Sequence, residues 1–313
     1  MRKILMLMIF MVFLGNELSA NAETNDWDLL ACGLKNCPKQ LLQCAGEGPC
    51  RKTLACNRDC GGSGSKADQQ ACHLVCQLGL GKESKIYPEL VSCFAQNECL
   101  PKLEPGKDGI CPVNSKNLKD VVKLNSIGDL DGTWLELKGL NCGKADSGWE
   151  GGYDALPCRS SSWVYSRDLW WYHTSFCKPG KDQYCENSKP VHLLARPSLS
   201  LSEAGLMEVP YIDPPLKPQD EKWYVLAHPH PDWLMYTYCG STPAGSYAGL
   251  NIASRAPDAR YSGIPQAVEE QLRKAATKFG VDYDSLCEND HRQCPAITAR
   301  EDVERALLDS PLF

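Results

Sequence analysis

Two adjacent carboxylates, Asp220 and Glu221, stand just before the aromatic pair Trp223-Tyr224. A carboxyl group held in an apolar cavity retains its proton more readily than one in water, and it can act as a general acid. Successive side chains of a strand point to opposite faces, so Glu221 would share a face with Trp223 and Asp220 would take the other. If Trp223 faces a cavity, Glu221 is the favoured candidate acid. The alternative is that both are solvated charges in the loop after Pro218.

Two histidines, His228 and His230, alternate with prolines and invite a metal-site interpretation. A structural or catalytic metal usually needs three or four protein ligands, and no third ligand stands nearby in the sequence, so we interpret this segment as a turn. The glycine-rich segment 61–65 is not followed by the Lys-Ser/Thr of a phosphate-binding loop, and no G-x-G-x-x-G occurs. The sequence therefore predicts no metal, flavin or nicotinamide cofactor.

The 313 residues include 33 Lys and Arg and 39 Asp and Glu, so the formal net charge is −6. Binding to nucleic acid needs a surplus of basic side chains, and the acidic balance argues against it. With 43% hydrophobic residues, the chain is apolar enough to form one or two ordinary cores. The 18 cysteines, an even number, indicate disulfides and an oxidising compartment.

The first 22 residues have the order of a cleavable signal peptide. Arg2 and Lys3 give the positive start, an apolar run covers residues 4–15, and Ala20-Asn21-Ala22 gives the small-residue cleavage site. The apolar run is too short for a membrane span, which needs about twenty residues. We expect residues 1–22 to be removed and the mature chain, from Glu23, to be exported.

The cysteines divide the mature chain into a dense and a sparse part. Ten of them fall between Cys32 and Cys99, and four-residue gaps such as Cys56 to Cys60 place both sulfurs on one helix face. Two helices with such pairs can be joined by two disulfides, and the spacing is not the C-x-x-C of a zinc site. A stretch rich in Pro, Gly and Lys, residues 101–112, is the predicted linker. We expect a Cys-rich helical domain over residues 23–112.

From residue 113 the pattern changes to strands. Short runs of aromatic and β-branched residues, separated by Gly, Pro, Asn and Asp, predict seven or eight strands in a sandwich or barrel over residues 113–262. The runs are 134–137, 162–165, 170–173, 191–194, 223–226, 233–238 and 250–253. A helix is expected over Ile264–Gly280 and a shorter one over Ala299–Leu308, within a C-terminal segment 263–313. The expected fold class is α+β.

Three marks in the strand region resemble those of the lipocalins, in order: Gly132-x-Trp134, the segment Asp232–Tyr238, and Arg255. The resemblance implies an eight-stranded antiparallel barrel that Trp134 closes at one end and that encloses a small apolar ligand. A Cys-rich helical module before such a barrel resembles the violaxanthin de-epoxidase family over roughly residues 30–296. The cysteine spacing and the segments Tyr153–Cys158 and Trp223–Leu226 carry this resemblance.

The resemblance implies a set of disulfides that spacing alone does not choose. The implied pairs are Cys32–Cys50, Cys37–Cys44, Cys56–Cys76, Cys60–Cys72, Cys93–Cys99 and Cys158–Cys294. Six further cysteines have no counterpart in the family pattern. Among these we expect Cys177–Cys185 to join the arms of a hairpin, and the pairing of Cys111, Cys142, Cys239 and Cys287 stays open.

The family reaction removes the epoxide oxygen of a xanthophyll, with ascorbate as co-substrate and a carboxylic acid that protonates the epoxide. The family's catalytic carboxylate, an Asp, lies two residues before the Trp of this strand, which is Glu221 here; Asp220 is one residue out of register. The resemblance also implies four ligand-lining residues: Trp223, Tyr238, His192 and Asp154. His192 stands near the place of a family glutamine, and Pro157 replaces a second carboxylate.

These departures leave two other functions open. The barrel could bind a carotenoid or another apolar ligand without turnover, or it could isomerise a xanthophyll epoxide without reducing it. Besides the xanthophyll, the expected partner is lipid, contacted peripherally by the barrel rim, and a homodimer is left open. The resemblance implies the thylakoid lumen of a plastid, whereas the leader is of the secretory type.

Overall fold

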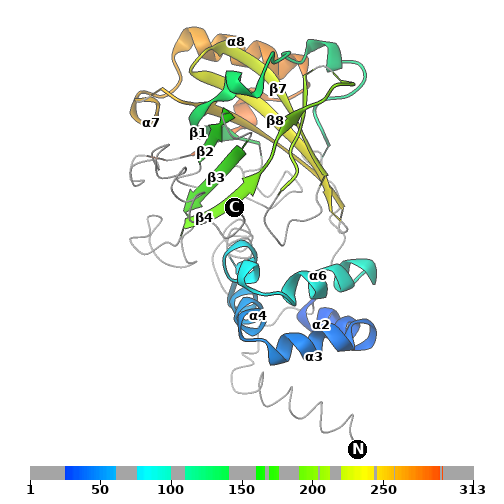
Figure 1. Cartoon of the computed structure of the whole chain (residues 1–313). Coiled ribbons are helices and arrows are strands. Elements are labelled where there is room, and N and C mark those ends of the chain that lie inside the picture. The colour runs from blue at the N-terminus through cyan, green and yellow to red at the C-terminus, as the bar shows by residue number, and fades with distance from the viewer. Residues whose placement is uncertain are drawn as a thin grey trace, which may run out of the picture.

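The computed structural model describes residues 25–60, 76–99, 110–140, 160–165, 169–175, 190–203, 205–211, 220–242, 245–256, 258–289 and 291. In Figure 1 a group of short helices, α2 to α6, lies below a curled sheet, and helix α8 lies across the top of the sheet. None of the helices in these ranges is both long and apolar enough to cross a membrane. The α+β class is confirmed. The signal peptide lies outside the described residues, and the boundaries at residues 112 and 262 stay predictions.

The N-terminal helices pack around a small apolar core. They are α2 (Asn25–Asn36), α3 (Pro38–Gly46), α4 (Gly48–Cys60) and α6 (Tyr87–Gln96), with the turns η1 (Cys76–Leu80) and η2 (Gly81–Glu83). Leu41, Leu90 and Phe94 belong to the core. A Cβ at Gly33 would lie 2.7 Å from the Phe94 ring, so the glycine allows α2 and α6 to approach closely.

Disulfides fasten these helices in a pattern that differs from the expected one. The bonds are Cys32–Cys99, Cys37–Cys93, Cys44–Cys50 and Cys56–Cys76. Cys56–Cys76 is confirmed, whereas the expected pairs Cys32–Cys50, Cys37–Cys44 and Cys93–Cys99 are wrong. Helix α6 packs against α2 and α3, and this contact brings Cys93 and Cys99 to Cα distances of 6.0 and 5.5 Å from Cys37 and Cys32. The expected pairs Cys60–Cys72, Cys158–Cys294 and Cys177–Cys185 each include a cysteine outside the described residues.

The sheet is antiparallel and has the order β4-β3-β2-β1-β9-β8-β7-β6-β5, with β10 beside β1. Its strands are β1 (Gly132–Gly139), β2 (Ser160–Val164), β3 (Leu169–Ser175), β4 (Pro190–Ala195), β5 (Ser198–Leu199), β6 (Leu206–Glu208), β7 (Asp220–His230), β8 (Trp233–Thr242), β9 (Gly245–Ser254) and β10 (Cys287–Glu288). Strands β5 and β10 have two residues each. The other strands form the eight-stranded curled sheet that the sequence predicts.

The sheet curls until its two ends meet. At the end of β4, Ala195 forms a bridge with Tyr211, in the segment after β6. The amide of Arg196 donates to the carbonyl of Pro210 over 3.1 Å. These contacts close the sheet into the barrel that the lipocalin marks imply.

Side chains alternate between the inside and the outside of the barrel. Along β7, Trp223 and Val225 join the inner core, whereas Tyr224 and Leu226 join an outer core. The outer core lies beneath helix α8 (Gln266–Lys278), which contributes Leu272 to it and confirms the expected C-terminal helix. The remaining short elements are η4 (Leu118–Asp120), η5 (Ile127–Leu130), α7 (Ala259–Ser262) and η8 (Tyr283–Ser285). The helix expected over 299–308 lies outside the described residues.

The C-terminal segment completes the wall of the barrel. Strand β2 pairs with β1 from Gly132 to Leu135, and β10 then pairs with Lys138 and Gly139 of the same strand. Cys287 of β10 is disulfide-bonded. A further disulfide, Cys111–Cys239, joins the segment before the sheet to β8 across 128 residues of sequence.

Candidate functional site

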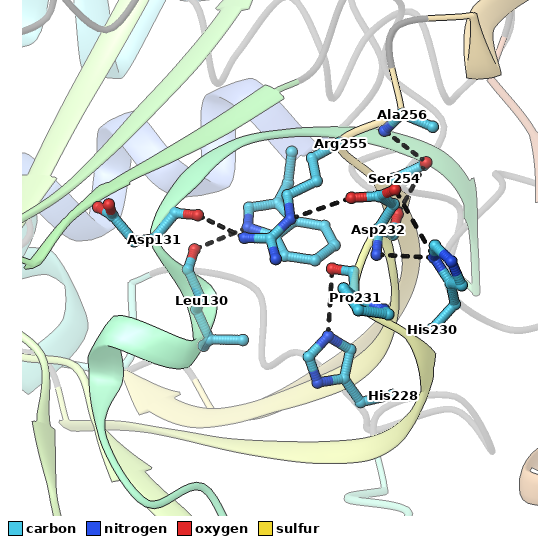
Figure 2. Close-up of polar contacts among 10 residues, drawn as sticks. Leu130, Asp131, His228, His230, Pro231, Asp232, Ser254, Arg255 and Ala256 are labelled. Atoms are coloured by element: carbon cyan, nitrogen blue, oxygen red, sulfur yellow. Dashed lines mark hydrogen bonds and ion pairs between the residues drawn. The ribbon is translucent and has the colours of Figure 1, made fainter.

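Trp134 and Arg255 lie against each other near the start of β1 and the end of β9. The Trp134 Nε1 donates to the carbonyl of Leu130 over 2.8 Å, and the Arg255 guanidinium lies 4.8 Å from the Trp134 ring centre, a cation–π distance. Arg255 also donates to the Asp131 carbonyl over 2.5 Å, and its Nε lies 3.4 Å from the Asp232 carboxylate. Figure 2 shows Arg255 between the two aspartates. The three lipocalin marks therefore meet at one place.

The two histidines lie at the end of β7, just before its hairpin turn into β8. The Asp232 amide donates to His230 Nδ1 over 3.2 Å, and His228 Nε2 lies 3.4 Å from the Pro231 carbonyl oxygen, contacts that Figure 2 draws. The expected turn is shifted, because His228 and His230 belong to the end of β7 and the turn itself is formed by Pro231 and Asp232. Across the part of the chain that the structure describes, no three His, Cys, Asp or Glu side chains are grouped to hold a metal ion.

The inside of the barrel holds a set of aromatic rings in mutual contact. Trp223 stacks on Tyr236 with ring centres 4.8 Å apart and 9° between the planes. It meets Trp170 edge-on at 5.0 Å, and Trp170 in turn lies 5.9 Å from Tyr211. Trp163 is 5.7 Å from Trp223. The rings give the interior an apolar, polarisable surface of the kind that suits an extended apolar ligand.

Glu221 lies in this interior. Its side chain is on β7, two residues before Trp223 and on the same face, and Glu221 is only 5% exposed. The hydroxyl of Tyr211 donates a hydrogen bond to its Oε2, and its backbone carbonyl accepts from Val209. Asp220 pairs in register with Ser241, and its side chain lies outside the described residues. The structure thus places the favoured candidate acid inside the barrel.

A second buried carboxylate, Glu136, was missed by the sequence reasoning. Glu136 is 0% exposed, and its Oε1 accepts from the hydroxyls of Ser161 over 2.7 Å and Tyr236 over 2.6 Å. Its backbone carbonyl lies 2.8 Å from Asn289 Nδ2 and 2.6 Å from His291 Nε2. The available signal was its spacing, because a residue two positions after Trp134 on one strand faces the same side as that ring.

The other expected ligand-lining residues differ in how the structure places them. Tyr238 belongs to the inner core, 6.0 Å from Trp223, and its ring packs over Gly249 of β9. His192 is on β4 in register with His173, and its side chain lies outside the described residues, as does Asp154 altogether. Trp223 and Tyr238 therefore come together with Glu221, and the roles of all these residues stay predictions.

The clearest pKa shift near the barrel lies on its outer side. Burial, together with the Glu203 carboxylate that accepts from the Tyr224 hydroxyl over 3.0 Å, raises the pKa of Tyr224 to about 12. Burial and the nearby Glu269 also raise the pKa of Tyr283, whose ring lies 4.3 Å from the Arg273 guanidinium. These tyrosines therefore remain neutral at any physiological pH, and they act as packing and hydrogen-bonding groups.

Solved structures with a similar fold were found, at low sequence identity. Lobster apocrustacyanin A1 covers 56% of this chain and 84% of its own, with 10% identity and a TM-score of 0.39. A bovine odorant binding protein covers 51% of this chain and 93% of its own, with 11% identity and a TM-score of 0.34.

Curated proteins match over more of the chain. The chloroplastic violaxanthin de-epoxidases of Arabidopsis thaliana and Spinacia oleracea are each 22% identical, over 296 and 282 residues, and each match covers 88% of this chain. The aligned part is 55% and 54% of those proteins, so the chain spans about half the length of the curated relatives it matches. The family model of the VDE lipocalin domain matches residues 29–291. With most of its length covered by that match, the chain belongs to the VDE lipocalin domain family.

Proposed function

We propose that this chain is an ascorbate-dependent xanthophyll de-epoxidase in which Glu221 is the proton donor. One observation supports this proposal most directly. Glu221 is a carboxyl group held by the Tyr211 hydroxyl among stacked aromatic rings, on the same strand face as Trp223. A general acid is useful only where its substrate can contact it, and the aromatic interior is the apolar surface that a xanthophyll end group needs. Family membership supplies the reaction class.

The chemistry requires a proton at the epoxide oxygen before the ring opens readily. Burial disfavours the charged form of a carboxyl group, which suits Glu221 to hold a proton until an epoxide lies beside it. Glu221 gives this proton to the oxygen, and the first C–O bond breaks. Ascorbic acid then supplies two electrons and two protons: the second C–O bond breaks, an alkene forms, the oxygen leaves as water, and Glu221 regains its proton. Ascorbate ends as dehydroascorbate.

The remaining parts of the proposal concern ligand delivery and location. Five disulfides each join two described residues, and such bonds are typical of an oxidising compartment. The relatives are named chloroplastic, and we extend to this chain the thylakoid lumen as its place of action. The xanthophyll would enter from lipid at the open rim of the barrel, opposite the end at which Trp134 and Arg255 lie.

The test uses the oxidised mature chain with violaxanthin in lipid vesicles at mildly acidic pH, with and without ascorbate, and separates the pigments by chromatography. Loss of epoxide that depends on ascorbate is the expected result. An altered pigment without ascorbate contradicts the reductase and favours an epoxide isomerase. Retained but unchanged pigment contradicts any turnover of this substrate and leaves a carotenoid-binding lipocalin.

A further inference from the structure

We propose that the barrel interior contains a second oxygen-binding site, separate from Glu221, in which Trp223 Nε1 and the Glu136–Tyr236 pair bind a hydroxyl group of the ligand. This inference rests on the proposed function in one respect, because it places an apolar ligand inside the barrel. It adds a residue, Glu136, to the ligand site and a chemical requirement to the ligand. The requirement is an alcohol oxygen in addition to the oxygen that Glu221 would protonate.

The first observation is an unpartnered donor in the centre of the ring set. Trp223 is 3% exposed, and its Nε1 is buried with no hydrogen-bond partner in the part of the chain that the structure describes. Native proteins pair nearly all buried N–H groups, because an unpaired donor loses its hydration and gains nothing in return. Trp134 illustrates the rule inside the same core, since its Nε1 donates to Leu130. An acceptor atom on a ligand would satisfy Trp223 in the same way.

The second observation is the polar group on the neighbouring ring. Tyr236 stacks face to face on Trp223 at 4.8 Å, and its hydroxyl donates to the Glu136 carboxylate. Glu136 is fully buried, and Ser161 fixes the same oxygen from β2. A buried carboxyl is costly unless hydrogen bonds compensate it, and Glu136 is therefore a strong and rigidly placed acceptor. The ring that donates to Glu136 is therefore stacked directly on the indole whose Nε1 has no partner.

A hydroxyl is the ligand group that fits both halves of this site. Its oxygen can accept from Trp223 Nε1, and its hydrogen can be donated to the Glu136–Tyr236 pair. An ether oxygen satisfies the indole alone, and a hydrocarbon satisfies neither. The site uses other groups than the acid, because Glu221 accepts from Tyr211, which contacts the ring set at Trp170. A purely structural role for Glu136 would explain its bonds to Ser161 and Tyr236 but would leave the Trp223 donor unexplained.

The test uses three ligands that differ only at one ring position: β-carotene, its 3,3′-dihydroxy derivative and the dimethyl ether of that alcohol. None of them carries an epoxide, so binding is measured without turnover. Ligands are delivered in detergent micelles to the full mature chain, and affinity is read from quenching of tryptophan fluorescence. One neutral hydrogen bond changes affinity about fivefold, and one to a carboxylate about tenfold or more. We expect the alcohol to bind about tenfold more tightly than the ether, and the ether about fivefold more tightly than the hydrocarbon.

Two variants test which residue causes each of the two differences in affinity. Trp223→Phe should abolish the difference between ether and hydrocarbon, and Glu136→Leu should abolish the difference between alcohol and ether. Trp233→Phe is the matched control, because it makes the same change at a buried tryptophan that packs outside the ring set, against Leu135 and Leu137, and it should preserve both ratios. If Glu136→Leu does not fold, Tyr236→Phe takes its place, and a reduced preference for the alcohol over the ether is expected.

Several results would overturn the inference. The inference is wrong if the three ligands bind the unmodified chain equally well, or if none of them shows saturable binding. A preference for the alcohol over the ether that persists in Glu136→Leu would show that the methyl groups are excluded by size alone. The outcome is independent of catalysis. If the chain prefers the alcohol but does not convert violaxanthin, this site is supported and the de-epoxidase proposal is contradicted. If the chain converts violaxanthin but has no preference for the alcohol, the de-epoxidase proposal is supported and this site is contradicted.

Discussion

Tyr238 and Gly249 lie in unusually close contact, and a single methyl group added at position 249 should lower the stability of the fold. The two residues face each other in register on β8 and β9. A Cβ at position 249 would lie 2.2 Å from both Cζ and the hydroxyl oxygen of Tyr238, so the ring must leave its place in the inner core. Overpacking of a core costs about 1–3 kcal/mol, and we expect Gly249→Ala to reach about 2–3 kcal/mol because an aromatic ring cannot bend away.

The assay is guanidinium unfolding of the oxidised chain, followed by circular dichroism. Gly48→Ala is the matched control, because a Cβ at this helical position meets nothing within 4 Å, and its stability should stay the same or rise slightly. In a Tyr238→Ala background the clash is gone, so Gly249→Ala should then cost less than about 0.5 kcal/mol. An equal loss with and without the Tyr238 ring would refute the packing described here, as would wild-type stability of Gly249→Ala alone.

Two further predictions concern stability. The pKa of Tyr224 is raised to about 12 from an ordinary value of 10.0, so the neutral form is favoured by folding; its contribution to stability is complete below pH 10 and is lost as pH rises from about 10 to about 12. Tyr224→Phe should remove this loss of stability at alkaline pH. If the free energy of unfolding falls equally in the variant and the wild type between about pH 10 and about pH 12, the prediction is wrong. Replacing Cys111 and Cys239 together with serine opens a bond that spans 128 residues, which should lower the free energy of unfolding by about 2–4 kcal/mol. A double variant within about 0.5 kcal/mol of wild type in guanidinium unfolding would exclude that bond as a stabilising link.

The sequence was sufficient for the elements whose pattern is local. The strands around Trp134, Trp223 and Trp233 are short runs of aromatic and β-branched residues bounded by turn residues, and the helix with Leu272 has apolar residues at i, i+4 spacing, so each could be placed before the structure was known. The face of Glu221 followed from the alternation of side chains along a strand, because it lies two residues from Trp223. Strands of two or three residues, such as β5 and β6, are too short to show a period.

What depended on tertiary contacts was not predictable in the same way. The partners of Cys93 and Cys99 are set by the docking of α6 on α2 and α3, and the spacing of the cysteines carries no record of that contact. The spacing of Glu136 from Trp134 indicates its face but not its burial or its partners. These are supplied by a tyrosine 100 positions away and by a C-terminal segment whose His291 lies 155 positions away.

The most direct measurement for the proposed function is the rate of ascorbate-dependent epoxide loss for Glu221→Gln beside Asp220→Asn. Glutamine keeps the size of the side chain and an oxygen that can accept from Tyr211, but its amide has no acidic proton to transfer. Loss of a general acid lowers a rate by about 10²–10⁴-fold. We expect Glu221→Gln to fall by at least about 100-fold while it still binds pigment, and Asp220→Asn to keep the wild-type rate. A wild-type rate in Glu221→Gln would remove this residue as the acid and with it the mechanism proposed here.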